Sequence, residues 1–226
     1  MGGSYVQGSD IRYCCNYGDI ISEGVSTGTG GISGSVDNVF SCYNFGNVID
    51  KSGFSNIGGI VGSCGQDRNI GNCYSGTIEV KSLEKGSGTY TGGIVGDHRG
   101  TILNCYNLSN VSDNNNAGGI NGGSGGSVKG VINNCYSLGK ITGKQSGGIS
   151  ASSKVETSNC FYLKGTAPGG VNSVDITGQA EPLEKSEKPS VIEVIQNQIE
   201  VNGEMINVWK EDTNNINNGY PILYWQ

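Results

Sequence analysis

Cysteine, histidine and acidic side chains are the residues of this sequence that could form a thiol, metal or acid–base site. The chain of 226 residues contains eight cysteines and one histidine, His98, which stands between Asp97 and Arg99. This trio could supply an acid, a base and an anion holder in a lyase or hydrolase, or could contact a glycan. Functional clusters of titratable residues are distinguished by an environment that shifts their pKa values, and no sequence pattern indicates such an environment here. We therefore interpret the trio as a solvated turn, assign no catalytic residue and predict that the chain is not an enzyme.

Six of the eight cysteines recur every 25 to 32 residues, each after a similar lead-in. They are Cys14, Cys42, Cys73, Cys105, Cys135 and Cys160. An even number of cysteines in a surface protein is also typical of disulfides. The regular recurrence favours instead one structural column of small, buried thiols, because free cysteine is among the most buried residue types. Cys15 and Cys64 fall outside this column and are the better candidates for a bridge or a reactive thiol.

Metal binding is not expected from these residue types. The cysteines lack Cys-x-x-Cys or Cys/His spacing, so we predict no zinc site and no cofactor. Two segments, 113–116 and 212–219, are rich in Asp and Asn and offer the oxygen ligands that Ca²⁺ takes. Neither segment has the spaced carboxylates and terminal Glu of an EF-hand loop, so polar turns explain both.

The elements that position these residues belong to a repeat. An aromatic residue follows the column cysteine in five of six repeats, then Asn or Ser, then a β-branched residue. The aromatic residues are Tyr43, Tyr74, Tyr106, Tyr136 and Phe161, and the β-branched ones are Ile20, Val48, Ile78, Val111 and Ile141. A Gly-Gly-Ile motif alternates with this pattern, at 30–32, 58–60, 92–94, 118–120 and 147–149. Each repeat therefore contains about three short β-prone pieces punctuated by turn residues.

Stacking is what allows such repeats to bury their apolar residues, because one unit alone has no partner for its apolar face. The sequence therefore predicts an all-β fold, a parallel β-helix (β-solenoid) of about six coils. Glycine pairs suit corners where a positive φ or the close approach of two coils excludes a Cβ. Asparagines aligned at turns are expected to form hydrogen-bonded ladders.

Four tyrosines are expected to form a column along this solenoid, about one strand spacing apart. They are Tyr43, Tyr74, Tyr106 and Tyr136. Facing outward, they would form an aromatic stripe of the kind that stacks on sugars or partner proteins. Facing inward, they would pack between coils. We favour packing, because stacked aromatic pairs gain ~1 kcal/mol from one another.

Composition changes near residue 170. Of the 40 glycines, only Gly178, Gly203 and Gly219 lie beyond it, whereas three of the four prolines do. We assign residues 1–170 to the solenoid and 171–226 to a small C-terminal cap, because an open last coil exposes core and unpaired strand edges. Apolar residues at 191–199 predict a short helix that starts at Pro189, although their β-branching also permits a strand.

The five Gly-Gly-Ile motifs and the alternating Cys-Tyr-Asn/Ser stretches resemble the GLUG-motif repeat proteins of bacteria, over residues 11 to 163. The aromatic ending, 217–226, is also similar to the close of such repeat regions in large surface proteins. Similar repeats occur in filamentous adhesins and beside the catalytic domain of some IgA-cleaving metallopeptidases. The peptidase motif His-Glu-x-x-His is absent here, so the resemblance implies an architecture and a surface location but no peptidase activity.

Charge and hydropathy restrict the partners further. Fourteen basic and twenty acidic side chains give a net charge of −6 without a Lys/Arg cluster, so nucleic acid is not an expected partner. No apolar run approaches the ~20 residues of a membrane-spanning helix, and we expect no membrane insertion. No signal peptide or anchor is recognisable in this chain.

We expect a non-catalytic structural or adhesive repeat module of a secreted or cell-surface bacterial protein, with a host glycan or a surface protein as its partner. Two alternatives stay open at this stage. One is a β-helix that binds or cleaves a polysaccharide. The other is a scaffold segment of a larger surface peptidase.

Overall fold

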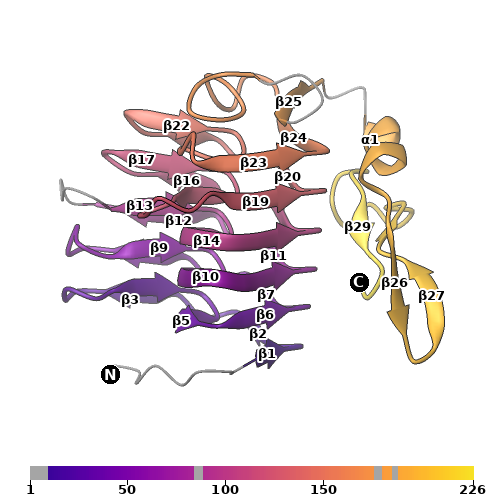
Figure 1. Cartoon of the computed structure of the whole chain (residues 1–226), viewed down its shortest axis with the longest axis horizontal. Coiled ribbons are helices and arrows are strands. Elements are labelled where there is room, and N and C mark those ends of the chain that lie inside the picture. The colour runs from indigo at the N-terminus through magenta and orange to yellow at the C-terminus, as the bar shows by residue number, and fades with distance from the viewer. Residues whose placement is uncertain (1–9, 84–88, 176–179, 185–187) are drawn as a thin grey trace.

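The computed structural model describes residues 10–83, 89–175, 180–184 and 188–226. The chain winds into a parallel β-solenoid, and a C-terminal segment lies along the flank of this rod (Figure 1). Four parallel sheets, here called A to D, run along the rod. Two of them contain five strands each, so the solenoid has about five complete turns, slightly fewer than the six predicted. The predicted fold class is confirmed.

Each sheet collects equivalent short strands from successive turns. Sheet A contains β1 (Asp10–Arg12), β6 (Asn38–Phe40), β10 (Val61–Gly71), β14 (Val95–Leu103), β19 (Gly130–Asn133) and β23 (Val155–Ser158), flanked by β5 (Ser33–Val36) and β18 (Asn121–Gly123). Sheet B contains β2 (Cys15–Asn16), β7 (Tyr43–Asn44), β11 (Tyr74–Ser75), β15 (Tyr106–Asn107), β20 (Tyr136–Ser137), β24 (Cys160–Leu163) and β25 (Ala180–Leu183). Sheet C contains β3 (Ile20–Ser22), β8 (Val48–Asp50), β12 (Glu79–Ser82), β16 (Asn110–Ser112) and β21 (Ile141–Thr142). Sheet D contains β4 (Gly28–Gly30), β9 (Asn56–Gly58), β13 (Tyr90–Gly92), β17 (Asn116–Gly118) and β22 (Gln145–Gly147).

The core of the rod consists of aligned apolar columns. The isoleucine of the Gly-Gly-Ile motif is fully buried in four turns, and these residues are Ile60, Ile94, Ile120 and Ile149. The β-branched column of sheet C differs from the sequence prediction in one turn. Val80, and not Ile78, pairs with Val48 and Val111, and the Ile78 side chain is 76% exposed. Val48 and Val111 each follow their column cysteine by six residues, whereas Val80 follows Cys73 by seven. Ile78 precedes the strand β12, which begins at Glu79, and so lies outside the paired column.

A column of left-handed residues makes the corner before sheet B. The residue before each column cysteine has a φ between 50° and 56°, and four of these six residues are asparagine. Asparagine tolerates this conformation better than most residues. The amides form the predicted ladder: Nδ2 of Asn104 donates to Oδ1 of Asn72 at 3.1 Å, and Nδ2 of Asn159 donates to Oδ1 of Asn134 at 3.0 Å. The glycines of the Gly-Gly-Ile motifs have no positive φ, so close approach is what requires them.

The C-terminal part differs from the predicted cap. β25 pairs in parallel with β24, from Cys160↔Ala180 to Leu163↔Leu183, so the solenoid continues past the boundary predicted at residue 170. The helix α1 (Lys188–Ile195) is present and begins next to Pro189. It is followed by the antiparallel hairpin β26 (Gln198–Val201)–β27 (Glu204–Asn207) and by β28 (Trp209–Lys210), which pairs with β29 (Ile222–Leu223).

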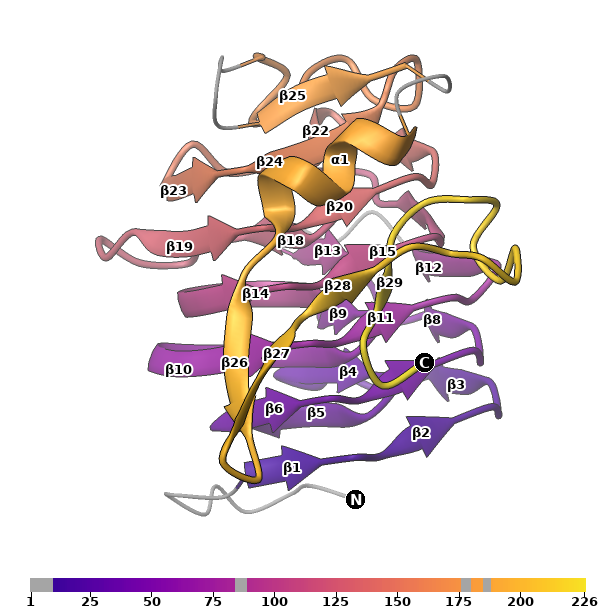
Figure 2. The ribbon, with the colours of Figure 1, turned by 90° about the vertical axis from the view of Figure 1, so that its right-hand side faces the viewer.

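We call residues 188–226 the strap, because they run back along the flank of the rod (Figure 2). Residues of α1, β28 and β29 pack against the tyrosines of sheet B. The strap therefore covers the flank of the solenoid, so the prediction that residues 171–226 close its end is corrected for residues 188–226. Over the last turn lie β25 and the parallel bridge between Ser150 and Val171. Among the described residues, no helix is long and apolar enough to cross a bilayer.

Candidate functional site

The four tyrosines of sheet B stack face to face along the rod. Ring centroids lie 5.2 Å apart for Tyr43 and Tyr74, 4.9 Å for Tyr74 and Tyr106, and 5.0 Å for Tyr106 and Tyr136. Side chains alternate between the two faces of a strand, and the preceding cysteines point into the core. The tyrosines therefore lie on the outer face of sheet B.

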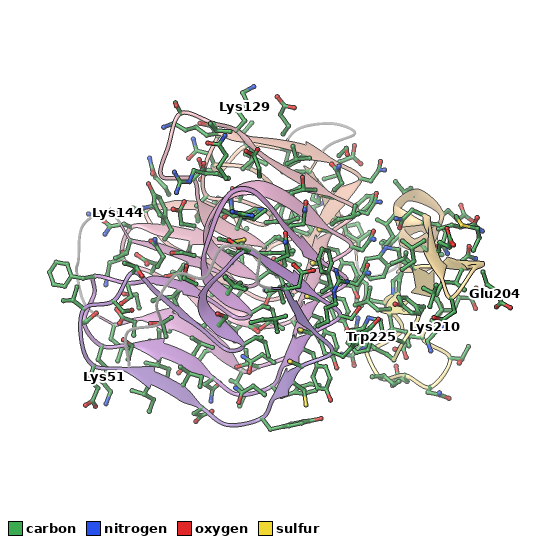
Figure 3. The ribbon with its side chains drawn as sticks, turned by 60° about the horizontal axis from the view of Figure 1, so that its bottom comes forward. Lys51, Lys129, Lys144, Glu204, Lys210 and Trp225 are labelled. Atoms are coloured by element: carbon green, nitrogen blue, oxygen red, sulfur yellow. The ribbon has the colours of Figure 1, made fainter. Side chains whose placement is uncertain are left out.

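The strap covers this outer face. Trp209 lies 5.6 Å from the Tyr136 ring, and Trp225 lies 5.7 Å from the Tyr74 ring, between the solenoid and the rest of the strap (Figure 3). The Tyr106 hydroxyl donates to Oε1 of Gln226 at 3.0 Å, and burial raises the pKa of Tyr74 to about 12. The tyrosine column thus faces outward from the solenoid and is nevertheless packed, because the strap covers it. The two expected alternatives, an outward stripe and inward packing, did not include this arrangement. These rings offer no open stripe for a sugar while the strap is in place.

Asp97, His98 and Arg99 lie in the middle of the strand β14, so their interpretation as a solvated turn is wrong. The His98 side chain is 1% exposed, whereas Asp97 and Arg99 are only partly buried. Alternation along the strand turns His98 into the rod and its two neighbours outward. The Asp97 carboxylate accepts the Gly125 N–H at 2.8 Å. The three side chains therefore do not share one site, and the acid–base constellation considered from sequence does not form.

Because His98 is buried, we expect the free energy of unfolding to depend on pH. Desolvation lowers the His98 pKa to about 4, whereas the unfolded chain keeps the ordinary value near 6.5. The unfolded state therefore binds the extra proton, and the folded state loses roughly 3 kcal/mol as the pH falls from 6.5 to 4. Urea unfolding at pH 7.5, 6.0, 5.0 and 4.5 measures this loss. In His98→Gln the loss over the same window is expected to be much smaller, and equal slopes in the two proteins would contradict the assignment.

The column cysteines stack as free thiols. The backbone N–H of Cys42 donates to Sγ of Cys73, and that of Cys105 donates to Sγ of Cys135, both at 3.4 Å. All six are buried except Cys14, which lies in the first turn. Burial raises the pKa of Cys73 and of Cys135 well above the ordinary value, so neither thiol ionises easily. The column therefore belongs to the core.

Cys15 and Cys64 are also free thiols, so the bridge considered for them is absent. Cys15 occupies the aromatic position of the first turn and pairs with Tyr43. Cys64 is buried next to the core, and desolvation raises its pKa to about 12. Because the thiolate is the reactive form, Cys64 is an unreactive thiol and the prediction of reactivity is corrected for this residue.

The two Asp/Asn-rich segments use their carboxylates within turns. Asp113 accepts a hydrogen bond from Oγ1 of Thr91 at 2.6 Å and another from the N–H of Asn115 at 2.6 Å. Asp212 accepts the N–H groups of Ile216 and Asn217 at 2.7 and 2.6 Å. Within the described parts of the chain, no group of three or more His, Cys, Asp or Glu side chains could hold a metal ion.

A polar groove that sequence reasoning missed lies beside sheet D. Its volume is about 270 Å³, and its lining includes Tyr90, Asn116 and Gln145 from sheet D and the loop residues Ser153 and Asn172. The wall of the groove that sheet D forms could have been recognised from the sequence. The residue two places before each of the last three Gly-Gly-Ile motifs is polar or aromatic, and the residue between is buried. The opposite wall comes from loops without a repeated motif.

The comparisons with known proteins bear on the fold. No family model and no curated protein matches the sequence, so the resemblance to GLUG-motif repeats stays a prediction. Among solved structures, the crystal structure of a putative immunoglobulin A1 protease from Bacteroides ovatus is similar, with a TM-score of 0.59 and 22% sequence identity. The match covers 96% of this chain and 69% of that chain. At this identity the likeness supports the β-solenoid class alone.

Proposed function

We propose that the chain is a non-catalytic structural or adhesive module of a secreted or cell-surface protein. The proposal rests on the positions of the side chains that could take part in catalysis or in ligand binding. His98 and five of the six column cysteines are in the core, and the tyrosines of sheet B lie under the strap. A rigid rod whose reactive residue types serve packing is suited to holding a surface in a fixed shape. It is poorly suited to acid–base or nucleophilic chemistry.

The Bacteroides ovatus neighbour supports the surface location, because the immunoglobulin in its name is a secreted protein. It also supports, less directly, the second candidate role, a scaffold segment of a larger surface peptidase. Both roles leave catalysis outside the residues described here. They differ in whether the module itself makes an adhesive contact.

Two assays test the proposal. The purified chain is incubated with immunoglobulin A1 and with a panel of polysaccharides, and new chain ends are quantified; no cleavage above that of the heat-denatured chain is expected. Beads coated with the chain are then passed over mucin. Retention supports an adhesive role, and absence of retention leaves only the structural one. Cleavage by the native chain would contradict the proposal as a whole.

A further inference from the structure

We propose that the polar groove beside sheet D is a binding site for a neutral oligosaccharide. This inference rests on the non-catalytic adhesive function proposed above and names a ligand class for it. The groove is distinct from the tyrosine column. Sheet D lies on the side of the solenoid away from the strap (Figures 1 and 2). No residue of the strap is among the described residues that line the groove.

The first wall of the groove is a ladder across three successive turns. Tyr90 pairs in register with Asn116, and Asn116 pairs with Gln145. The next residue in each strand is buried, so these three side chains point outward. They are therefore spaced by one strand separation, ~4.8 Å. A pyranose ring has a similar length, so consecutive sugar units would meet consecutive turns.

The opposite wall supplies hydrogen-bonding groups that the fold has not used. The side chains of Ser153 and Asn172 line it. Among the described residues, the side-chain amide of Asn172 on this wall has no hydrogen-bond partner, and neither do the Gln145 amide and the Tyr90 hydroxyl on the first wall. The Asn116 amide, by contrast, already donates to the Thr89 carbonyl at 2.9 Å. Amide groups donate and accept at once, as a sugar hydroxyl does. Such groups on both walls match a ligand that carries hydroxyls along both edges.

The Tyr90 ring gives the groove its apolar surface. The ring lies against Gly123, where an added Cβ would be 2.0 Å from ring atom Cδ1. The missing side chain at Gly123 therefore leaves room for the ring, which is half-buried in the groove lining. An aromatic face with convergent polar groups is a common composition of ligand sites, and a sugar presents a C–H face to such a ring.

The charge of the lining favours a neutral ligand. Lys154 is the one charged side chain among the described residues that line the groove, and its Nζ already donates to the Gly126 carbonyl at 2.9 Å. No carboxylate is among the described residues that line the groove, so these residues do not supply the acid and base of a glycosidase. Binding without cleavage is the chemistry that remains.

The test is an array of neutral, acidic and sulfated oligosaccharides probed with the full chain, followed by titration calorimetry of the tightest neutral ligand. We expect neutral oligosaccharides of three or more units to bind best. Tyr90→Ala and Gln145→Ala are each expected to weaken binding, that is, to raise Kd about fivefold to tenfold. Gly123→Ala, which displaces the Tyr90 ring into the groove, is expected to weaken oligosaccharide binding as well. Lys144→Ala, adjacent in sequence but outside the lining, is the matched control and should leave Kd unchanged.

Gln145 is exposed, so its variant remains informative if Tyr90→Ala fails to fold. The inference is overturned if no neutral oligosaccharide binds, if acidic glycans are preferred, or if Tyr90→Ala and Gln145→Ala, both folded by circular dichroism, bind like the native chain. Shortening of the bound oligosaccharide would contradict the non-catalytic function instead and leave the ligand class of the groove intact.

Discussion

Replacing Gly118 with alanine is expected to destabilise the solenoid by about 3 kcal/mol or more. A Cβ at this position would lie 1.9 Å from the carbonyl oxygen of Asn121 and 3.0 Å from the backbone nitrogen of Ala151. Both contacts are with backbone atoms, which cannot rotate away as the end of a side chain does. The first contact lies within one turn, so relieving it would require the corner between β17 and β18 to open. The second lies between turns, and relieving it would weaken the hydrogen bond from Ala151 N–H to Asn121 C=O, 3.2 Å in the native chain.

The measurement is urea unfolding followed by far-ultraviolet circular dichroism. Gly24→Ala is the matched control, because an added Cβ there meets no atom within 4 Å and the residue has no positive φ. This variant is expected to be as stable as the native chain, or slightly more stable through a less flexible unfolded state. If Gly118→Ala unfolds at the same urea concentration as Gly24→Ala, close approach of backbone atoms is not what requires glycine at this position.

The architecture could be predicted from the sequence because each aligned column places the same structural requirement on every turn. A cysteine, a buried isoleucine and a glycine pair recur at nearly constant spacing, and only stacked turns satisfy all three at once. The Asn ladder followed from the same alignment. His98 was misjudged because flanking charges suggest solvent, whereas period-two alternation places it inside β14.

The positions of the strap and the groove depend on contacts between segments far apart in the chain. Sequence reasoning recognised an aromatic-rich ending and a column of tyrosines but did not pair them, although each was an apolar surface without a partner. Residues 106 and 226 meet across 120 positions. The groove was missed for a similar reason, since the loop containing Ser153 carries no repeat motif and only the folded rod places it opposite Tyr90.

Removing the Trp209 side chain is expected to release the strap from sheet B. Trp209 is 1% exposed and packs against Tyr106 and Tyr136, at 6.2 and 5.6 Å between ring centroids. Truncating a buried tryptophan to alanine costs about 3–5 kcal/mol. The backbones of the solenoid strands are hydrogen-bonded to neighbouring turns, whereas the hydrogen bonds between the described residues of the strap and sheet B involve tyrosine side chains, such as Tyr106 with Gln226. We therefore expect the strap to be destabilised before the solenoid.

Trp209 and Trp225 are the two tryptophans of the chain and both lie in the strap, so in Trp209→Ala the fluorescence of Trp225 reports strap binding alone. Its transition in urea is expected to move to lower concentration than the circular dichroism of the sheets, and the strap should become sensitive to protease. Trp209→Phe retains a ring over Tyr136 and should keep much of the contact. Fluorescence and circular dichroism that still change together in Trp209→Ala would mean that strap and solenoid unfold as one unit. The tyrosine column would then depend on the strap for its stability, because Trp209 and Trp225 together pack against all four of its rings.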